Sequence, residues 1–416
     1  MSQPVVDTSK SHLIPDCQSR SGDDPIFALN AEAGRRARAG ESIVNATLGA
    51  LMEDDGRLAT MPVVAEALAA VPPERGAAYA QIAGDPPFLQ AVVRDLFGEG
   101  PLAAQSVAAA TPGGTGALYH AVSSFLRPGD ALLTSSYFWG PYKTIAQHTG
   151  RKVETFPMFE AGGRLDVAGF GKALEAVARK QGRALVLLNT PCHNPTGYSL
   201  DDAEWKAVAR ALREASALAP VTLCVDFAYA RFGAGDPLAW VRHVEPLLGD
   251  VLLLVAWSAS KAYAQYGARV GALVASHPDP AARERIAHAL SFACRGTWSN
   301  CNHLGMLAIT ELLRDPALRA RADRERGRLR GLLDERVAAF NAAAQRAGLR
   351  HPRYEGGFFV TVFTSDGERA AARARELGVY VVPLPGAVRV ALCGTSARDV
   401  PRLVDALAEG VRAAGG

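Results

Sequence analysis

The sequence lacks the features that mark several classes of protein. Its six cysteines are scattered without any C-x-x-C pair, which disfavours a zinc site or a disulfide framework. The 45 basic and 42 acidic side chains nearly cancel, so a formal net charge of +3 gives no concentrated field for nucleic acid or an anionic membrane. Residues 1–24 are polar, and no apolar run reaches the length of a membrane span. We therefore expect a soluble, cytoplasmic protein with no metal and no nucleic-acid or membrane partner.

What the sequence does contain is enough apolar residues for a large core, since 49% of its 416 residues are hydrophobic. Apolar runs of strand length alternate with segments of helical period, such as 201–217. The runs at 183–190, 221–229 and 250–258 are apolar on both faces, which is typical of parallel strands covered by helices. The pattern predicts an α/β fold whose large domain has a mainly parallel sheet covered by helices.

The pattern changes after Pro316, where apolar residues recur at helical spacing through an arginine-rich segment. We expect one long helix there, followed by strands at 356–363 and 379–384. The N- and C-terminal segments would then form a smaller α+β domain. The predicted division is a flexible N-terminal segment (1–23), the N-terminal part of the small domain (24–57), a large domain (58–315), and a linking helix with the rest of the small domain (316–416).

Four polar stretches close apolar runs, and ligands of open α/β sheets bind at the carboxyl ends of the strands. Taken singly, each has an ordinary explanation: a tight turn, a loop, a structural ion pair or a surface lysine. In the first, a helix expected to begin near Gly116 follows two glycines, which suits a phosphate. The stretches are "TPGGTGALYHA" from Thr111, "NTPCHNPTG" from Asn189, "VDFAYARF" from Val225 and "WSASKAY" from Trp257.

Taken together, these stretches suggest a single site. Ser258 and Ser260, two apart on an extended chain, can point their hydroxyls the same way, and Arg269 follows at the start of the next strand. With the glycine-rich turn they make a phosphate cradle. A lysine beside a phosphate, with a carboxylate at a neighbouring strand end, is the arrangement expected around pyridoxal phosphate: Lys261 would form the Schiff base, and Asp226 would pair with the pyridinium nitrogen.

At this point the chain resembles the aspartate and aromatic amino-acid aminotransferases of the pyridoxal-phosphate fold-type I group. The resemblance runs from Asp24 to Gly394 and rests on "ATPGGTGAL", "CHNPTG", "DFAY" and "SASKAYAQYGARVGA". It implies that Lys261 carries the cofactor and shuttles a proton between the substrate Cα and the cofactor C4′. It also implies a ping-pong transfer of an amino group from an acidic or aromatic L-amino acid to a 2-oxo acid such as 2-oxoglutarate.

The resemblance assigns further roles to residues that bind the cofactor or the substrate. Arg389 would bind the substrate α-carboxylate, with Asn194, Trp139 and Gly49 among the substrate contacts. Arg295 would receive a distal carboxylate. Tyr79 would reach a neighbouring subunit's phosphate, so the resemblance implies a homodimer in which Tyr79 and Arg295 come from the partner. The cofactor contacts it implies are Gly113, Gly114, Thr115, Ser258, Ser260 and Arg269 at the phosphate, Asp226 at the ring nitrogen, Tyr229 and Asn194 at the ring 3-oxygen, and Trp139 stacked on the ring.

The chain departs from the family pattern around the substrate. Tyr142 stands where the family usually has a histidine behind the pyridinium aspartate. Leu51 replaces a frequent tyrosine, 299–302 reads Ser-Asn-Cys-Asn, and extra residues precede Arg389. Three alternatives remain: a lyase or decarboxylase of the same fold, a non-catalytic cofactor-binding sensor, and a nucleotide-binding α/β protein. The sensor would need a DNA-binding module, for which the residues before Asp24 are too few. The nucleotide-binding protein would leave Asp226, Lys261 and Arg269 unexplained as a set.

Overall fold

The largest sheet of the molecule forms the floor of the site. The structure is a computed structural model of the 416-residue chain that describes residues 11–18, 20, 22 and 25–415. Within these residues the sheet has seven strands in the order β2-β8-β7-β6-β5-β3-β4. Their bounds are β2 (Ser106–Pro112), β3 (Ala131–Ser135), β4 (Lys152–Phe156), β5 (Ala184–Asn189), β6 (Val221–Asp226), β7 (Val251–Ser258) and β8 (Val270–Ser276).

Most neighbouring strands in this sheet are parallel, which confirms the predicted fold class. Strands β4, β3, β5, β6 and β7 run in one direction, and β8 is antiparallel to both β7 and β2. Alternate residues of the central strands pack on opposite sides: Leu185 and Leu187 contact the cluster that includes α7 (Gly113–Phe125), while Val186 packs with residues of α9 (Val167–Gln181). Because both faces are covered, the strands read as continuous apolar runs.

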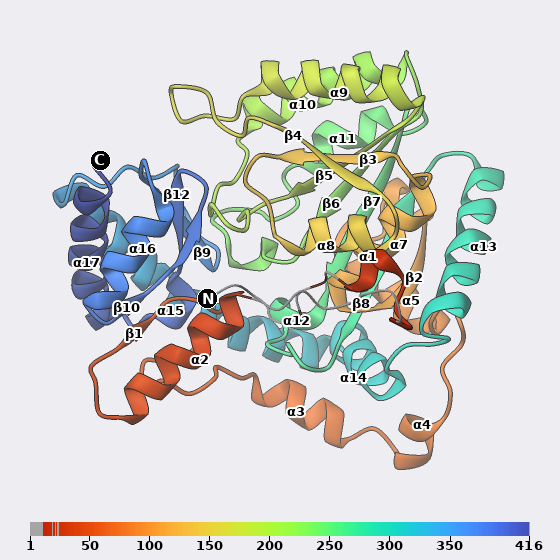
Figure 1. The fold of residues 1–416 in the computed structure, drawn as a ribbon. Helices are drawn as coiled ribbons and strands as arrows, with labels where there is room; N and C mark the ends of the chain where they lie inside the picture. Colours follow the sequence, from red (N-terminus) through yellow and green to blue (C-terminus); the bar gives the residue numbers. More distant parts are fainter. Residues whose placement is uncertain (1–10, 19, 21, 23–24, 416) are drawn as a thin grey trace.

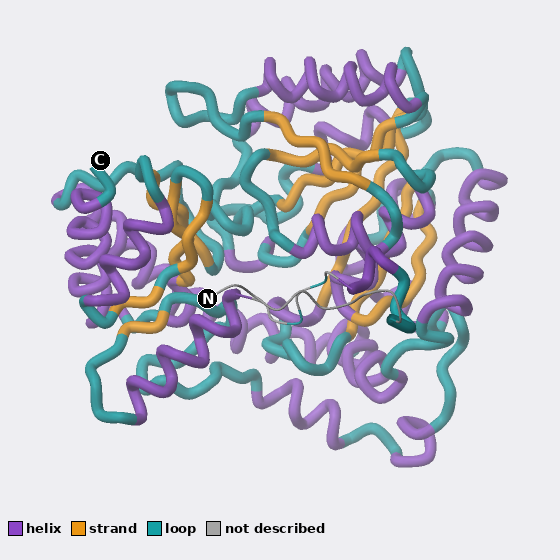
Figure 2. Tube along the Cα trace, in the orientation of Figure 1, coloured by secondary structure: helices purple, strands orange, loops and turns teal. Residues whose placement is uncertain are grey.

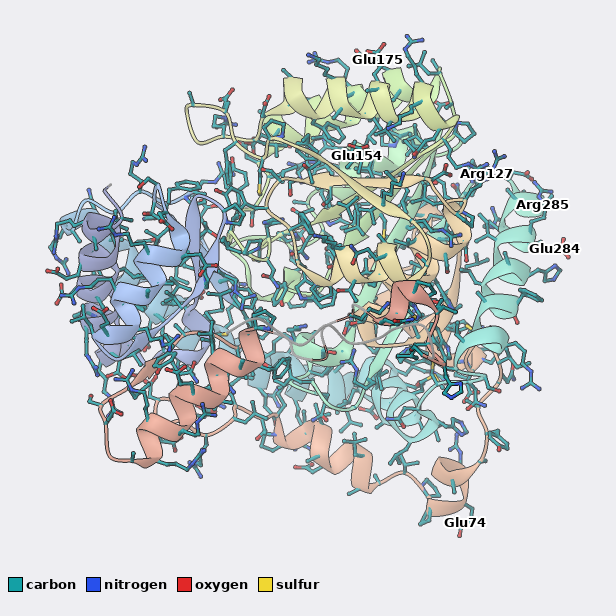
Figure 3. All side chains as sticks on the ribbon, viewed as in Figure 1. Glu74, Arg127, Glu154, Glu175, Glu284 and Arg285 are labelled. Atoms are coloured by element: carbon teal, nitrogen blue, oxygen red, sulfur yellow. The ribbon has the colours of Figure 1, made fainter. Side chains whose placement is uncertain are left out.

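Several helices around the sheet begin at residues that favour a helix N-terminus. Asp201 and Glu204 form a capping box at the start of α10 (Asp202–Ser216), and Pro141 opens α8 (Pro141–His148). The charged side chains labelled on the outer helices point to solvent (Figure 3). The other helices here are α3 (Pro62–Ala69), α4 (Pro73–Ala77), α5 (Pro86–Phe97), α6 (Pro101–Ala104), α11 (Val241–Val244), α12 (Ala259–Ala262), α13 (Pro280–Thr297) and α14 (His303–Arg314).

A second group of elements stands beside the large sheet (Figures 1 and 2). A 31-residue helix, α15 (Pro316–Arg346), leads into it, as predicted. In this second group, three strands form an antiparallel sheet in the order β11-β12-β9. A separate pair, β1 and β10, is parallel and joins the N- and C-terminal segments. The elements are α2 (Pro25–Arg38), β1 (Val44–Asn45), β9 (Phe359–Phe363), α16 (Gly367–Glu376), β10 (Val379–Tyr380), β11 (Val382–Leu384), β12 (Ala387–Ala391) and α17 (Val400–Ala413).

Two of the smaller elements differ from expectation or lie at the edge of the described residues. Strands form within 379–384, as expected, but Val381 separates β10 from β11, and these two strands join different sheets. The predicted flexible segment 1–23 lies mostly outside the described residues, which here include the short helix α1 (Pro15–Gln18). The division into domains with borders near 24, 58 and 316 stays a prediction. Within the described part of the chain, no helix is long and apolar enough to cross a membrane.

Candidate active site

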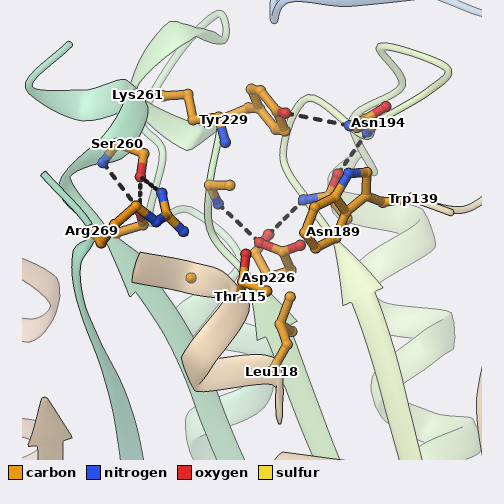
Figure 4. A pocket seen from close by; sticks show the side chains of 13 residues that line it. Thr115, Leu118, Trp139, Asn189, Asn194, Asp226, Tyr229, Ser260, Lys261 and Arg269 are labelled. Carbon is orange, nitrogen blue, oxygen red and sulfur yellow. Dashed lines mark hydrogen bonds between the residues drawn. The ribbon is translucent and has the colours of Figure 1, made fainter. Parts of the chain in front are cut away.

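A cavity of about 250 Å³ lies at the carboxyl ends of the central parallel strands (Figure 4). Asn189 ends β5, Asp226 ends β6 and Ser258 ends β7, so the parallel arrangement brings their side chains to one edge of the sheet. The lining residues are Gly114, Thr115, Leu118, Trp139, Asn189, Asn194, Asp226, Ala228, Tyr229, Ser258, Ser260, Lys261 and Arg269. The cavity therefore unites the polar stretches that the sequence singled out.

One side of the cavity is built to hold an anion. Arg269 Nη1 donates to Ser260 Oγ at 3.3 Å, and the hydroxyls of Ser258 and Ser260 lie 3.0 Å apart. Helix α7 points its free N-terminal N–H groups here, and an anion is favoured at such an end. A Cβ added at Gly113 would meet Arg269 Nη2 at 2.5 Å, and the backbone there has φ +71°, so glycine is required for this close approach.

Two details of this side differ from expectation. Helix α7 begins at Gly113 rather than near Gly116, so Gly113, Gly114 and Thr115 are its first turn. Ser260 is not on an extended chain: it lies in the one-turn helix α12, and the Ser258 side chain accepts a bond from its N–H at 3.1 Å. The two hydroxyls still meet because this serine cap turns the chain at the end of β7.

The carboxylate of Asp226 is buried and has a tyrosine partner. Tyr142 Oη donates to Asp226 Oδ2 at 2.7 Å, and the backbone N–H of Ala228 donates to Oδ1 at 3.3 Å. Burial raises the pKa of Asp226, whereas the bond from Tyr142 and the charge of Lys261 oppose that rise. Burial and the nearby Asp226 charge raise the pKa of Tyr142 well above its usual range, so Tyr142 stays a neutral donor. Trp139 packs edge-on against Tyr142, with ring centroids 5.7 Å apart.

Lys261 faces Tyr229 across the cavity. Its Nζ lies 5.1 Å from the centre of the Tyr229 ring, and burial lowers the pKa of the amine, with Arg269 adding to the effect and Asp226 opposing it. Asn194 Nδ2 donates to Tyr229 Oη at 3.3 Å. Asn194 Oδ1 is buried and has no hydrogen-bond partner among the described residues, which is costly unless a ligand or water satisfies it.

Asn189 is a lining residue that the sequence motifs contained but that was not predicted to belong to the site. Its Nδ2 donates to the Asp226 carbonyl at 2.9 Å, and its Oδ1 accepts from Asn194 N at 2.6 Å. Asn189 thus ties the loop after β5 to the end of β6. The signal that could have found it is its place as the polar residue closing a fully apolar strand.

Of the predicted substrate residues, Asn194 and Trp139 line the cavity, whereas Arg389, Gly49 and Arg295 are not among its lining residues. Phe359 packs edge-on against Tyr229, with centroids 5.6 Å apart, and the Arg389 guanidinium lies over Phe359 at 4.6 Å. A Cβ at Gly49 would meet Phe359 Cζ at 2.4 Å, so Gly49 belongs to the same neighbourhood. Tyr79 is 91% exposed, and its place in the site stays a prediction.

Arg295 also stays outside the cavity in the single chain. It is exposed near the end of α13, where its Nη1 donates to Ser299 Oγ at 2.7 Å. His193 and Cys192, in the loop after β5, are buried, and burial lowers the pKa of His193 to about 3. No group of histidine, cysteine or carboxylate side chains in the described residues could hold a metal ion.

The residues present fit pyridoxal phosphate. An arginine, two hydroxyls and a helix N-terminus suit its phosphate, and a buried carboxylate suits a protonated ring nitrogen. A lysine amine with a lowered pKa suits covalent attachment to its carbonyl, and the amide of Asn194 with the Tyr229 hydroxyl suits its ring oxygen.

Comparisons with known proteins agree with this chemistry. A curated aromatic-amino-acid aminotransferase of Paracoccus denitrificans is 29% identical over 395 residues, which cover 93% of this chain and 97% of the relative. An aspartate aminotransferase of Pseudomonas aeruginosa is 29% identical over 375 residues, which cover 86% of this chain and 90% of that protein.

Solved structures show the same fold across almost the whole chain. The crystal structure of an aminotransferase from Anaerococcus prevotii aligns with a TM-score of 0.90 and 31% identity over 96% of this chain and 98% of that one. An aromatic-amino-acid aminotransferase from Burkholderia pseudomallei, covalently bound to pyridoxal phosphate, aligns with a TM-score of 0.81 and 26% identity, covering 97% and 99% of the two chains. The model of the family "Aminotransferase class I and II" matches residues 43–407. Since that match spans most of the chain, the protein belongs to the class I and II aminotransferases and is a pyridoxal-phosphate-dependent enzyme.

Proposed function

We propose that this aminotransferase moves the amino group of an acidic or aromatic L-amino acid to a 2-oxo acid such as 2-oxoglutarate in a ping-pong reaction. The observation that carries the proposal is that Lys261, Asp226 and Arg269 line one cavity at the carboxyl end of the sheet. The relatives named for aromatic amino acids and for aspartate support these two classes of donor.

In this proposal each side of the cavity holds one part of the cofactor. Arg269 and the first turn of α7, with Ser258 and Ser260, would bind the phosphate, and Asp226 would hold the protonated ring nitrogen. Asn194 and Tyr229 would donate hydrogen bonds to the ring oxygen, and Trp139 would stack on the ring. The bound cofactor supplies an electron-accepting ring that makes the substrate Cα proton acidic.

Lys261 is the proposed general base. With the cofactor and substrate bound, the Lys261 Nζ would take the proton from the substrate Cα and give it back at the end of the transfer. Burial lowers the pKa of Lys261, so a larger fraction of the amine is neutral at a given pH than for an exposed lysine. A second substrate then runs the same steps in reverse, which gives ping-pong kinetics.

Arg389 is the proposed binding group for the substrate α-carboxylate. Its Nη2 already donates to the Thr47 carbonyl at 2.6 Å, which holds the guanidinium in one orientation. A planar guanidinium can present two parallel donors to a carboxylate. Gly49, Asn194 and Trp139 complete the proposed substrate contacts.

The proposal includes a cytoplasmic homodimer whose active sites are shared between subunits. Tyr79 of one subunit would reach the phosphate of the other, and Arg295 would bind the distal carboxylate of an acidic substrate. The 91% exposure of Tyr79 supports this arrangement, because a large aromatic side chain in water has apolar surface to bury. Closure of the smaller domain over the carboxylate would exclude water.

The test is a spectrum of the purified holoenzyme as candidate amino acids are added one at a time. Donors of the proposed classes convert the cofactor to its amine form, and conversion stops after one turnover without a 2-oxo acid. Arg295→Ala is then compared with Arg285→Ala, an arginine of the same helix whose side chain points outward (Figure 3). We expect Arg295→Ala alone to weaken acidic donors and to spare aromatic ones. Equal loss for both donors, or none, contradicts the role of Arg295, and continued turnover without an acceptor contradicts transamination.

A further inference from the structure

The segment 47–51 connects the proposed substrate arginine to the loop that carries the anion site. It follows β1 and includes the fully buried Thr47. At its start, the Thr47 carbonyl accepts from Arg389 Nη2 at 2.6 Å, and the Leu48 carbonyl accepts from Cys393 Sγ at 3.7 Å. The C-terminal part of the chain therefore fixes one end of this segment.

The other end of the segment is held by Tyr266, which lies between Lys261 and Arg269 in sequence. The backbone N–H of Leu51 donates to Tyr266 Oη at 3.0 Å. The Tyr266 carbonyl in turn accepts from Arg269 Nη1 at 2.9 Å. One residue thus uses its side chain to hold the segment 47–51 and its backbone to hold the arginine of the anion site.

Arg269 is held in place by three hydrogen bonds within the protein. Its Nη1 is shared between Tyr266 O and Ser260 Oγ, and its Nη2 donates to Pro112 O at 3.2 Å. The residue also has φ +55°, a conformation that costs energy for any side chain other than glycine and persists only where neighbours hold it. An anion bound by the guanidinium would add such a neighbour, and it would steady Tyr266 through the shared hydrogen bond.

We propose that Tyr266 is a positioning residue that couples the phosphate site at Arg269 to the segment 47–51, and through Thr47 to Arg389. Occupation of the phosphate site steadies the segment further, so Arg389 is held more firmly in its orientation for a substrate carboxylate when the cofactor is in place. This inference rests on the proposed role of Arg389. Binding of the phosphate and binding of the substrate carboxylate raise each other's affinity by the same factor, because coupling between binding sites is reciprocal.

The first test uses the full chain with the cofactor removed and inorganic phosphate as the probe. Hydrogen exchange is measured on the peptide that contains Leu51, with a peptide from β6 as the reference. In the parent, phosphate slows exchange of the Leu51 amide, and in Tyr266→Phe that amide exchanges faster and no longer responds to phosphate. Tyr263→Phe is the matched control, because the Tyr263 ring packs on Arg326 and Trp257 instead of holding the segment.

The second test uses the holoenzyme and separates positioning from a purely structural role. Tyr266→Phe raises the KM for both substrates by roughly three- to tenfold, the range expected for one lost hydrogen bond, and changes kcat less than twofold. Cofactor affinity and the thermal midpoint stay close to those of Tyr263→Phe. The coupling is wrong if phosphate leaves Leu51 exchange in the parent unchanged or slows it equally in Tyr266→Phe, or if the KM does not rise. Since the exchange experiment involves no transamination, it stands or falls separately from the proposed substrates.

Discussion

Replacing Tyr142 by phenylalanine removes one hydrogen bond from the cofactor site and leaves the packing in place. Tyr142 is fully buried, and its hydroxyl donates to Asp226 Oδ2 at 2.7 Å. Its ring stacks on Phe138 with centroids 6.3 Å apart and meets Trp139 edge-on. Phenylalanine keeps both ring contacts, so the variant isolates the hydroxyl.

The size of the effect follows from the charge on the acceptor. A hydrogen bond to an ionised group contributes about 1.5–3 kcal/mol. If that amount is lost from Asp226, the carboxylate proposed to hold the ring nitrogen, cofactor affinity falls by roughly 10- to 150-fold, since each 1.4 kcal/mol is a factor of ten. The pKa of Asp226, already raised by burial, rises further without its donor. Protonation of Asp226 then begins at higher pH, so the loss of cofactor affinity on acidification moves to higher pH in the variant.

Cofactor dissociation constants, measured by absorbance across a pH series, check this prediction. The control is Tyr198→Phe, which removes a similar bond from a tyrosine to a carboxylate, 2.6 Å long to Glu204 Oε1, at a place that does not line the cavity. Both variants lower the thermal midpoint, but only Tyr142→Phe weakens the cofactor. If Tyr142→Phe binds the cofactor as tightly as the parent, and loses affinity at the same acidic pH, then the Tyr142 hydroxyl does not stabilise the Asp226 carboxylate.

Three further predictions concern the anion site, the substrate arginine and a buried histidine. Gly113→Ala places a Cβ 2.5 Å from Arg269 Nη2, so we expect weaker binding of cofactor and of inorganic phosphate, measured by calorimetry; unchanged affinity for both would show that the close approach is unimportant. Arg389→Lys keeps the charge but loses the two parallel donors, so the KM for both substrates rises by about tenfold or more while cofactor affinity is kept; an unchanged KM would remove Arg389 from the carboxylate site. Burial lowers the pKa of His120 to about 4, and the residue stacks on Trp298 at 4.2 Å. Because an unfolded histidine takes up its proton near pH 6.5, the free energy of unfolding falls as pH drops from about 6.5 to 4, by about 3 kcal/mol for this residue. His120→Phe keeps the stack and removes that share of the pH dependence, measured by denaturant unfolding at several pH values; an unchanged slope would mean that His120 is already charged in the folded protein.

The sequence predicted the sheet and the location of the site because both depend on local patterns. Continuous apolar runs predict strands that are covered on both faces, and β5 and β6 are buried along their whole length. A polar residue that ends such a strand must lie at the sheet edge, which is how Asp226 was identified. The four polar stretches converge for the same reason, since parallel strands present their carboxyl ends together.

Contacts between distant residues could not be predicted in this way. Tyr142 could be placed behind Asp226 only through the family resemblance, and no local pattern pairs two residues 84 positions apart. The bond from Leu51 to Tyr266 joins positions 215 apart and depends on how the segments pack. Ser260 was misjudged because a serine cap turns the chain into helix α12 straight after β7, where the apolar run gave no sign of a turn. Tyr79 and Arg295 were assigned to a neighbouring subunit, so the geometry of a single chain leaves their roles as proposals.

The central claim is that the amine of Lys261 carries the cofactor in the resting enzyme. Borohydride reduction of the holoenzyme, followed by protease digestion and mass spectrometry, tests it most directly. We expect the added mass of the cofactor on the peptide that contains Lys261, and we expect Lys261→Ala to abolish this labelling while Lys206→Ala leaves it intact. Cofactor fixed to a different lysine, or no fixed cofactor in an active preparation, would contradict the account.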